Sequence, residues 1–351
     1  MVIADGGVKP GLFASTEAYV DGFEVALRRV LGEPSLGAFI LVLANASFDA
    51  ARYRRFRVDL DRAMDRWSDA FDRGLPEAQD APADDVEVFR QLRDIGLDAL
   101  EVTQWRDLGP WRLQFNAVRA LRPPRMSDAV VDHLLRPFDP RAFHFNKPFL
   151  RPEILWEGCW GRPMRLLFNK FPFAPGHGLL VPEPEQALPQ YLDPDRLQLL
   201  WDLTLDAGAH LPGIGFGYNA LGAYASVNHL HFQLFVDSAD AAYPVELPQW
   251  CHNGGAVDYP LPVTCFDDPG AAWRRIDALQ QADHAFNLLV RPGRLFAIER
   301  ARQGSYRHSA WTGGFAWSEV AGSITLFERE RFESLDEAEV MTEFGRLRAP
   351  G

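Results

Sequence analysis

The spacing of apolar and polar positions divides the chain into helical and extended segments. Two stretches place apolar residues every three or four positions and predict amphipathic helices, Glu17–Leu31 and Arg52–Gly74. Between them lies the continuous apolar run Ala38–Ala44, which is too short to span a bilayer and predicts a buried strand. The acidic run Glu77–Glu87 predicts a solvated loop.

The middle of the chain predicts short strands separated by turns. The expected extended segments are Trp111–Leu121, Phe143–Leu150, Arg165–Phe171 and Leu179–Val181. The sequence Arg122-Pro123-Pro124-Arg125 ends the first of them, because proline interrupts a strand. Asp193-Pro194 has the residue types of an N-cap and a first helical position, and it predicts a helix that runs to Ala209.

The last third of the chain again mixes helices and strands. After loops that reach about Gly270, the pattern predicts a helix at Ala271–Ala282, extended segments at Ala285–Val290, Arg294–Glu299 and Ser318–Phe327, and a helix at Leu335–Leu347. Short strands in mixed order with tight Pro/Gly turns are typical of an α+β fold with a largely antiparallel sheet. The chain contains no strict repeat, no G-x-G-x-x-G element and no P-loop.

One stretch, Gly217–Val236 (GYNALGAYASVNHLHFQLFV), carries the most chemistry. If Ser226–Val236 is a strand, side chains alternate between its faces, and the apolar face contains Leu230, Phe232, Leu234 and Val236. The opposite face then presents His229, His231 and Gln233, about 7 Å apart at about 3.3 Å per residue. Such a row could be histidines hydrogen-bonded within a sheet, a metal pair, or a site that holds a phosphate and attacks it.

Composition and charge narrow the classes of function. The chain has 351 residues, a length that fits one or two domains, and 47% of them are hydrophobic, which indicates a globular protein. Its formal net charge is -12. The negative charge argues against a nucleic acid or a membrane as partner, since both repel an acidic surface. Three scattered cysteines and a start without a basic-then-apolar pattern favour the cytoplasm. Cys251, His252 and Cys265 include no C-x-x-C pair, so no metal is expected.

Several motifs together resemble the histidine-triad (HIT) superfamily. They are Asn169, the octapeptide PGHGLLVP at 175–182, Asn219, and His229-Leu230-His231-Phe232-Gln233. Glutamine at the third triad position is similar to the transferase branch, which includes galactose-1-phosphate uridylyltransferase and diadenosine tetraphosphate phosphorylase. The stretch GYNALGAYASVNHLHFQ resembles the GDP-L-galactose/GDP-D-glucose phosphorylase family, and this likeness extends over about residues 50–347.

The resemblance implies a HIT-like, largely antiparallel sheet with flanking helices in two related half-domains. The first half, residues 51–240, would hold the triad, and residues 241–351 would form a second half without a triad that ends in a helix. Residues 1–50 would be an N-terminal extension. The resemblance leaves the oligomeric state open, with a homodimer among the alternatives.

The resemblance also implies a mechanism without a cofactor. His231 would attack the α-phosphorus of a GDP-hexose, form a nucleotidyl-histidine and release hexose 1-phosphate, and inorganic phosphate would then take the nucleotide. A neutral imidazole is the reactive form, and its ordinary pKa of about 6.5 keeps it available at neutral pH. His229 and Gln233 would hydrogen-bond the phosphoryl oxygens as charge develops. Glutamine cannot act as an acid, which suits a sugar phosphate that leaves as a stable anion.

Further candidates for substrate binding follow from the same stretch and its surroundings. Contacts to phosphate or ribose are expected from Asn219, Gly222 and Ser226, a substrate contact from Asn169, and contacts to the second phosphate from Lys147 and Arg122. His177 is expected to be a structural residue of its turn.

Two places leave the identity of the sugar open. The chain has Ala321-Gly322-Ser323 where the family tends to have Ser-Gly-His, and the loop 237–268 is unusual in content. The alternatives are a dinucleoside polyphosphate phosphorylase or another transferase of nucleoside monophosphates, and a nucleotide-binding protein without catalysis.

Overall fold

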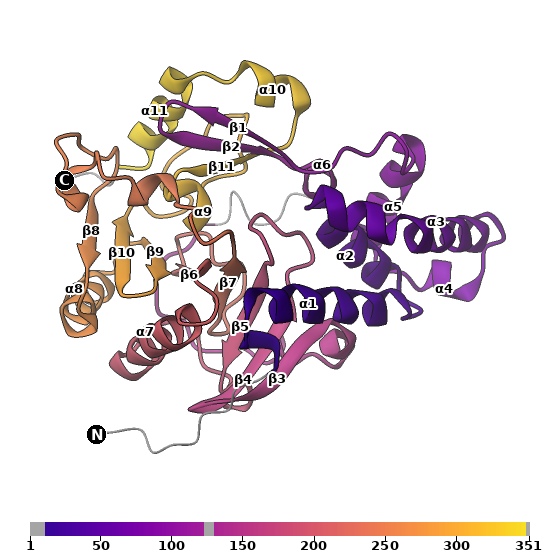
Figure 1. Ribbon diagram of the computed structural model, residues 1–351, viewed down its shortest axis with the longest axis horizontal. Coiled ribbons are helices and arrows are strands. Elements are labelled where there is room, and N and C mark those ends of the chain that lie inside the picture. Colours follow the sequence, from indigo (N-terminus) through magenta and orange to yellow (C-terminus); the bar gives the residue numbers. More distant parts are fainter. Residues whose placement is uncertain (1–10, 123–129, 349–351) are drawn as a thin grey trace.

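A computed structural model describes residues 11–122 and 130–348, and its dominant feature is an eight-stranded sheet (Figure 1). The strand order is β3-β4-β5-β7-β6-β9-β10-β8, and every neighbouring pair is antiparallel. The strands are β3 (Ile154–Trp160), β4 (Arg162–Phe168), β5 (Gly178–Pro182), β6 (Ile214–Asn219), β7 (Phe232–Val236), β8 (Val263–Phe266), β9 (Phe286–Arg291) and β10 (Arg294–Glu299). This arrangement confirms the predicted α+β fold with a largely antiparallel sheet.

A second, three-stranded sheet joins residues 104–115 to a strand near the end of the described chain. It contains β1 (Gln104–Leu108), β2 (Trp111–Phe115) and β11 (Ser323–Leu326), and β11 pairs parallel with β2. Figure 1 shows this small sheet beside α10 (Arg329–Ser334) and α11 (Glu337–Arg346). The predicted strand Trp111–Leu121 ends early, because the Asn116 side chain accepts the Arg119 N–H and begins the short helix α6 (Ala117–Ala120).

The N-terminal helices gather at one side of the molecule, in indigo and purple in Figure 1. They are α1 (Thr16–Leu31), α2 (Leu36–Ser47), α3 (Ala50–Asp72), α4 (Pro76–Gln79) and α5 (Ala83–Ile95). The structure confirms the helices predicted at Glu17–Leu31 and Arg52–Gly74. The strand predicted at Ala38–Ala44 is wrong, because these residues lie in α2, whose twelve residues are all buried against α1, α3, α5 and α6. A helix that is covered on every side shows no amphipathic period, so an apolar run cannot distinguish it from a buried strand.

Two further predictions of local structure are wrong. The expected loop Glu77–Glu87 contains most of α4 and the start of α5, whose first turn carries Asp84 and Asp85, where the positive end of the helix dipole favours acids. The expected strand Phe143–Leu150 consists of turns that lead into a 3-10 helix, Pro148–Glu153. A proline in that segment cannot donate to a strand ladder.

The helices of the second half of the chain were largely predicted. They are α7 (Pro194–Gly208), α8 (Pro269–Gln281) and α9 (Trp317–Val320), followed by α10 and α11. The Asp193 side chain caps α7 by accepting the Arg196 N–H at 2.8 Å, as predicted. The segment predicted at Ser318–Phe327 divides into the end of α9 and strand β11. No strand was predicted at β1, β3, β6 or β8, and no helix was predicted at α10.

The two faces of the large sheet belong to different hydrophobic clusters. Phe216, Phe232 and Leu234 pack with α7 and α8 on one face. The other face contributes Phe235, Leu289 and Phe296 to a cluster that also contains Trp317 of α9. The sheet is continuous across residue 240, since β6 pairs with β9 from Phe216↔Val290 to Asn219↔Asn287. The division into two related halves remains a prediction. Within residues 11–122 and 130–348, no helix is long and apolar enough to cross a membrane.

Candidate active site

The two histidines lie just before a strand rather than within one. The predicted strand Ser226–Val236 is wrong in its first part, because β7 begins only at Phe232. Gln190 replaces a neighbouring strand here: its side chain accepts the His231 N–H at 2.9 Å and donates to the His231 carbonyl at 3.2 Å. The same amide donates to the Asn219 carbonyl at 2.9 Å, which holds the end of β6 beside His231. The segment is therefore fixed although it is not part of the ladder.

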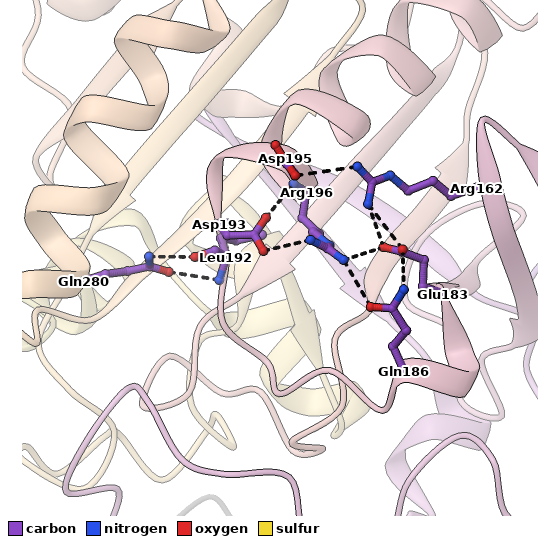
Figure 2. A network of polar contacts seen from close by, with 8 residues as sticks. All are labelled: Arg162, Glu183, Gln186, Leu192, Asp193, Asp195, Arg196 and Gln280. Carbon is purple, nitrogen blue, oxygen red and sulfur yellow. Dashed lines mark hydrogen bonds and ion pairs between the residues drawn. The ribbon is translucent and has the colours of Figure 1, made fainter.

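The segment that carries Gln190 is itself held at both ends by polar contacts (Figure 2). At its start, Glu183 accepts hydrogen bonds from Arg196 at 2.8 Å and from Arg162 at 3.2 Å. At its end, the Gln280 amide of α8 donates to the Leu192 carbonyl at 3.0 Å and accepts the Leu192 N–H at 3.1 Å. These contacts fix the path of residues 183–192 and, through Gln190, the backbone of His231.

His231 has one ring nitrogen engaged and the other available. Its Nδ1 lies 2.8 Å from the carbonyl oxygen of His229. A carbonyl only accepts, so Nδ1 carries the proton and Nε2 of the neutral ring has the lone pair. Burial lowers the pKa of His231 to about 4, so the ring is neutral at pH 7. Nε2 makes no hydrogen bond to any residue that the structure describes.

His229 is held in the opposite tautomer. Its Nδ1 accepts the backbone N–H of Phe145 at 3.2 Å, which places the proton of the neutral ring on Nε2. This Nε2 is buried and meets hydrogen-bonding geometry with no described residue, although the backbone of Pro184 is near enough to oppose the lowering of the His229 pKa. Burial, with the neighbouring His231 as a smaller cause, lowers the pKa of His229 to about 4. The Phe145 ring lies against both imidazoles, with centroids 4.9 Å from His231 and 5.6 Å from His229.

The side chain of Gln233 is oriented by two donors. Its Oε1 accepts hydrogen bonds from His177 Nε2 at 3.1 Å and from Trp317 Nε1 at 3.0 Å. His177 Nδ1 accepts the Phe173 N–H at 3.3 Å, which leaves the proton on His177 Nε2. Burial lowers the pKa of His177 to about 3, so the ring is neutral at pH 7. The Gln233 NH2 group makes no hydrogen bond to any described residue and is available as a donor.

Asn219 repeats this arrangement on the next strand. Its Oδ1 accepts the backbone N–H of Trp317 at 2.8 Å and the Asn287 amide at 2.7 Å. The pairing Gly217↔Gln233, continued by two residues, places Asn219 opposite His231. The Asn219 NH2 group likewise has no hydrogen bond to a described residue, so two amides expose donors beside the His231 ring.

The other candidates lie further from this centre. Gly222 has φ +79, which only glycine adopts readily, and its carbonyl accepts the Gln303 N–H at 2.6 Å. Ser226 is exposed, and its side chain makes no hydrogen bond to a described residue. Asn169 lies beside the site, with its Nδ2 3.4 Å from His177 Nε2.

The two basic candidates, Lys147 and Arg122, lie within the described residues. Lys147 lies two residues after Phe145, and its side chain donates to the Pro140 carbonyl at 3.0 Å. Arg122 follows α6, at the end of the described range 11–122. The substrate contacts expected of Gly222, Ser226, Asn169, Lys147 and Arg122 remain predictions. Among residues 11–122 and 130–348, no group of three His, Cys, Asp or Glu side chains could hold a metal ion.

Three residues that shape the site were not predicted from the sequence, namely Gln190, Phe145 and Trp317. One signal pointed to the last of them. Gly217 lies inside β6, and a Cβ atom there would lie 2.1 Å from Cδ2 of Trp317. A glycine inside a strand often marks the close approach of another group, but the sequence does not show which group it is.

An antiparallel sheet that presents paired histidines and a glutamine in this way is a HIT-like fold. A solved structure with a similar fold is that of yeast Ap4A phosphorylase Apa2, with a TM-score of 0.50, 16% sequence identity and coverage of 71% of this chain and 88% of that one. Residues 111–235 match the family described as "GDPGP1-like, N-terminal domain".

Curated relatives match about a third of the chain. GDP-D-glucose phosphorylase 1 of Bos taurus is 37% identical over 128 residues, which cover 34% of this chain and 32% of the relative. GDP-L-galactose phosphorylase 2 of Arabidopsis thaliana is 33% identical over 142 residues, which cover 35% of this chain and 32% of the relative. The matched region thus spans about a third of these relatives. The predicted resemblance to GDP-hexose phosphorylases is confirmed for residues 111–235, whereas its predicted extent over about residues 50–347 remains a prediction.

Proposed function

We propose that the protein is a nucleotidyltransferase that converts a GDP-hexose and inorganic phosphate into GDP and hexose 1-phosphate. The observation that carries the proposal is the 2.8 Å contact between His231 Nδ1 and the His229 carbonyl, which leaves the Nε2 lone pair as a nucleophile. The similarity of residues 111–235 to GDP-hexose phosphorylases supports the choice of substrate.

The reaction proceeds in two displacements at the α-phosphorus. His231 Nε2 attacks this atom, the bond from the α-phosphorus to the bridging oxygen breaks, and hexose 1-phosphate leaves as an anion. The ring of the guanylyl-histidine is then cationic, and the His229 carbonyl stabilises its Nδ1–H. A phosphate oxygen next attacks the same phosphorus, GDP leaves, and the neutral imidazole returns.

Three donors would stabilise the charge that develops on the phosphoryl oxygens. They are the Nε2–H of His229 and the NH2 groups of Gln233 and Asn219. Each is attached to a side chain that is fixed by other contacts before substrate binds. Preorganised donors of this kind contribute about 10²- to 10³-fold to rate in other enzymes.

The direct test incubates the protein with a GDP-hexose and phosphate and measures GDP and hexose 1-phosphate. His231→Ala should abolish turnover, and its midpoint of unfolding in urea should equal that of the wild-type protein. The control is His210→Ala, since His210 is exposed near the end of α7 and should leave turnover unchanged. Turnover by His231→Ala at the wild-type rate would contradict the mechanism.

Omitting phosphate separates the two displacements. The wild-type protein should gain the mass of one guanylyl group, detected by intact-protein mass spectrometry, and the adduct should disappear when phosphate is added. Replacing the GDP-hexose with a dinucleoside polyphosphate in the same assay tests the alternative donor. Nucleotide binding by calorimetry with no adduct for any donor would instead identify a nucleotide-binding protein without catalysis.

A further inference from the structure

We infer that Trp317 is a positioning residue, which fixes the side-chain amides of Gln233 and Asn219 so that both present their NH2 groups to the substrate. The identity of that substrate as a nucleotide phosphate rests on the proposed function, whereas the contacts of Trp317 do not. Trp317 opens α9 and is fully buried.

Two different N–H groups of Trp317 make the contacts. The indole Nε1–H donates to Gln233 Oε1 at 3.0 Å, and the backbone N–H donates to Asn219 Oδ1 at 2.8 Å. An amide can rotate so that its oxygen and nitrogen exchange places, with little change in shape. A rotation here would bring an NH2 group against an N–H donor and lose the hydrogen bond. Trp317 therefore helps to determine, at both amides, which end faces outward.

The indole ring is too closely packed to turn away. It stacks on Phe235 with a centroid distance of 5.3 Å and an interplanar angle of 12°. Its other ring neighbours are Tyr243 at 5.3 Å and Phe173 at 5.8 Å. On the sheet side it lies directly against the backbone of Gly217, where even a Cβ atom would not fit. The direction of Nε1–H is thus set by the core rather than by the hydrogen bond alone.

Trp317 shares each amide with a second donor. His177 also donates to Gln233, and Asn287 also donates to Asn219. Loss of the indole N–H should therefore loosen the Gln233 amide without releasing it. Since the NH2 donors act mainly on charge that develops in the transition state, the effect should fall on kcat rather than on KM.

The experiment compares Trp317→Phe with Trp111→Phe. Trp111 is a matched control because it is equally buried, belongs to the same hydrophobic cluster, and has an indole N–H without a hydrogen-bond partner. We expect Trp317→Phe to lower kcat about tenfold, less than the loss of a whole donor, with KM changed less than about twofold. Trp111→Phe should change kcat less than about twofold. Equal losses of kcat in both variants, or no loss in Trp317→Phe, would overturn the inference.

A second measurement does not depend on turnover. The chain has ten tryptophans, so a ¹⁵N spectrum of the indole groups is simple, and the two Phe variants identify the signals of Trp317 and Trp111. Gln233→Glu replaces a neutral acceptor with a charged one and should move the Trp317 signal downfield, while the Trp111 signal stays in place. An unmoved Trp317 signal would overturn the inference. Absence of turnover with every GDP-hexose, combined with a shifted signal, would count against the proposed function alone.

Discussion

Gln190 offers a sharp test of how the site is built, through the substitution Gln190→Ala. The side chain is almost fully buried and makes three hydrogen bonds, two to the backbone of His231 and one to the carbonyl of Asn219. The substitution removes all three and leaves the His231 N–H without this partner. The backbone N–H of Gln190, which donates to Asn228, is retained.

The magnitude of the effect follows from these contacts. A hydrogen bond contributes about 1 kcal/mol net to stability, and a buried donor left without a partner costs about 1–3 kcal/mol. Three lost bonds, one of them leaving a buried N–H unpaired, give a destabilisation of about 3 kcal/mol. Because the His231 backbone is then free to shift, we also expect the rate of adduct formation to fall.

The assay is a urea titration followed by tryptophan fluorescence and by far-ultraviolet circular dichroism. Gln198→Ala is the control, because Gln198 lies on the exposed side of α7 and donates only to Asp202, at 2.9 Å. That variant should change the free energy of unfolding by less than about 0.5 kcal/mol. If Gln190→Ala were no less stable than Gln198→Ala, the conclusion that Gln190 replaces a strand partner would be refuted.

Three further predictions concern pH, charge and packing. Burial lowers the pKa of His231 to about 4, so the rate of adduct formation in quenched-flow mass spectrometry should stay level from pH 7 to 5, and an inflection near 6.5 would contradict it. Below about pH 6.5 the unfolded chain binds more protons than the folded one, because His231 has its ordinary pKa only when the chain is unfolded. The free energy of unfolding should therefore fall as the pH drops from about 6.5 to about 4. Gln233→Glu keeps the oxygen that binds Trp317 but loses the NH2 donor and adds negative charge, so kcat should fall at least about 100-fold in a variant that still unfolds cooperatively in urea. Gly217→Ala should destabilise by about 1–3 kcal/mol in urea titration because its Cβ meets the indole, whereas Gly345→Ala, in open space on α11, should stabilise by about 0.5–1 kcal/mol.

The residues that we propose to be reactive could be singled out in the sequence because they lie within five positions of one another. Alternation correctly separated Leu230 and Phe232, which are buried in one cluster, from His231 and Gln233. It gave the wrong extent for the strand, since the backbone before Phe232 bonds to the Gln190 side chain rather than to a strand. The alternation thus holds from Leu230 to Gln233, although Leu230 and His231 lie outside the strand.

The features of the fold and the site that could not be predicted depend on contacts between residues far apart in the sequence. The run Ala38–Ala44 is a helix because other helices cover it on all sides, and no local pattern records that covering. Phe145 lies 84 residues before His229 in the sequence, yet its N–H determines the tautomer of that ring. Trp317 likewise acts on a glutamine 84 residues before it. Such pairings are set by the sheet topology, which residue spacing does not specify.

The position of Trp317 has a consequence for the order in which the protein becomes active during its synthesis. A chain emerges from the ribosome from its N-terminus, and contacts between distant residues form only after both partners are available. His231 and Gln233 therefore emerge well before the residue that orients Gln233, and before β9 can pair with β6. A nascent chain that ends at residue 300 would carry every triad residue and the His177 donor, and would still lack the Trp317 donor to Gln233. Full activity should thus appear late in translation, which limits turnover by incomplete chains.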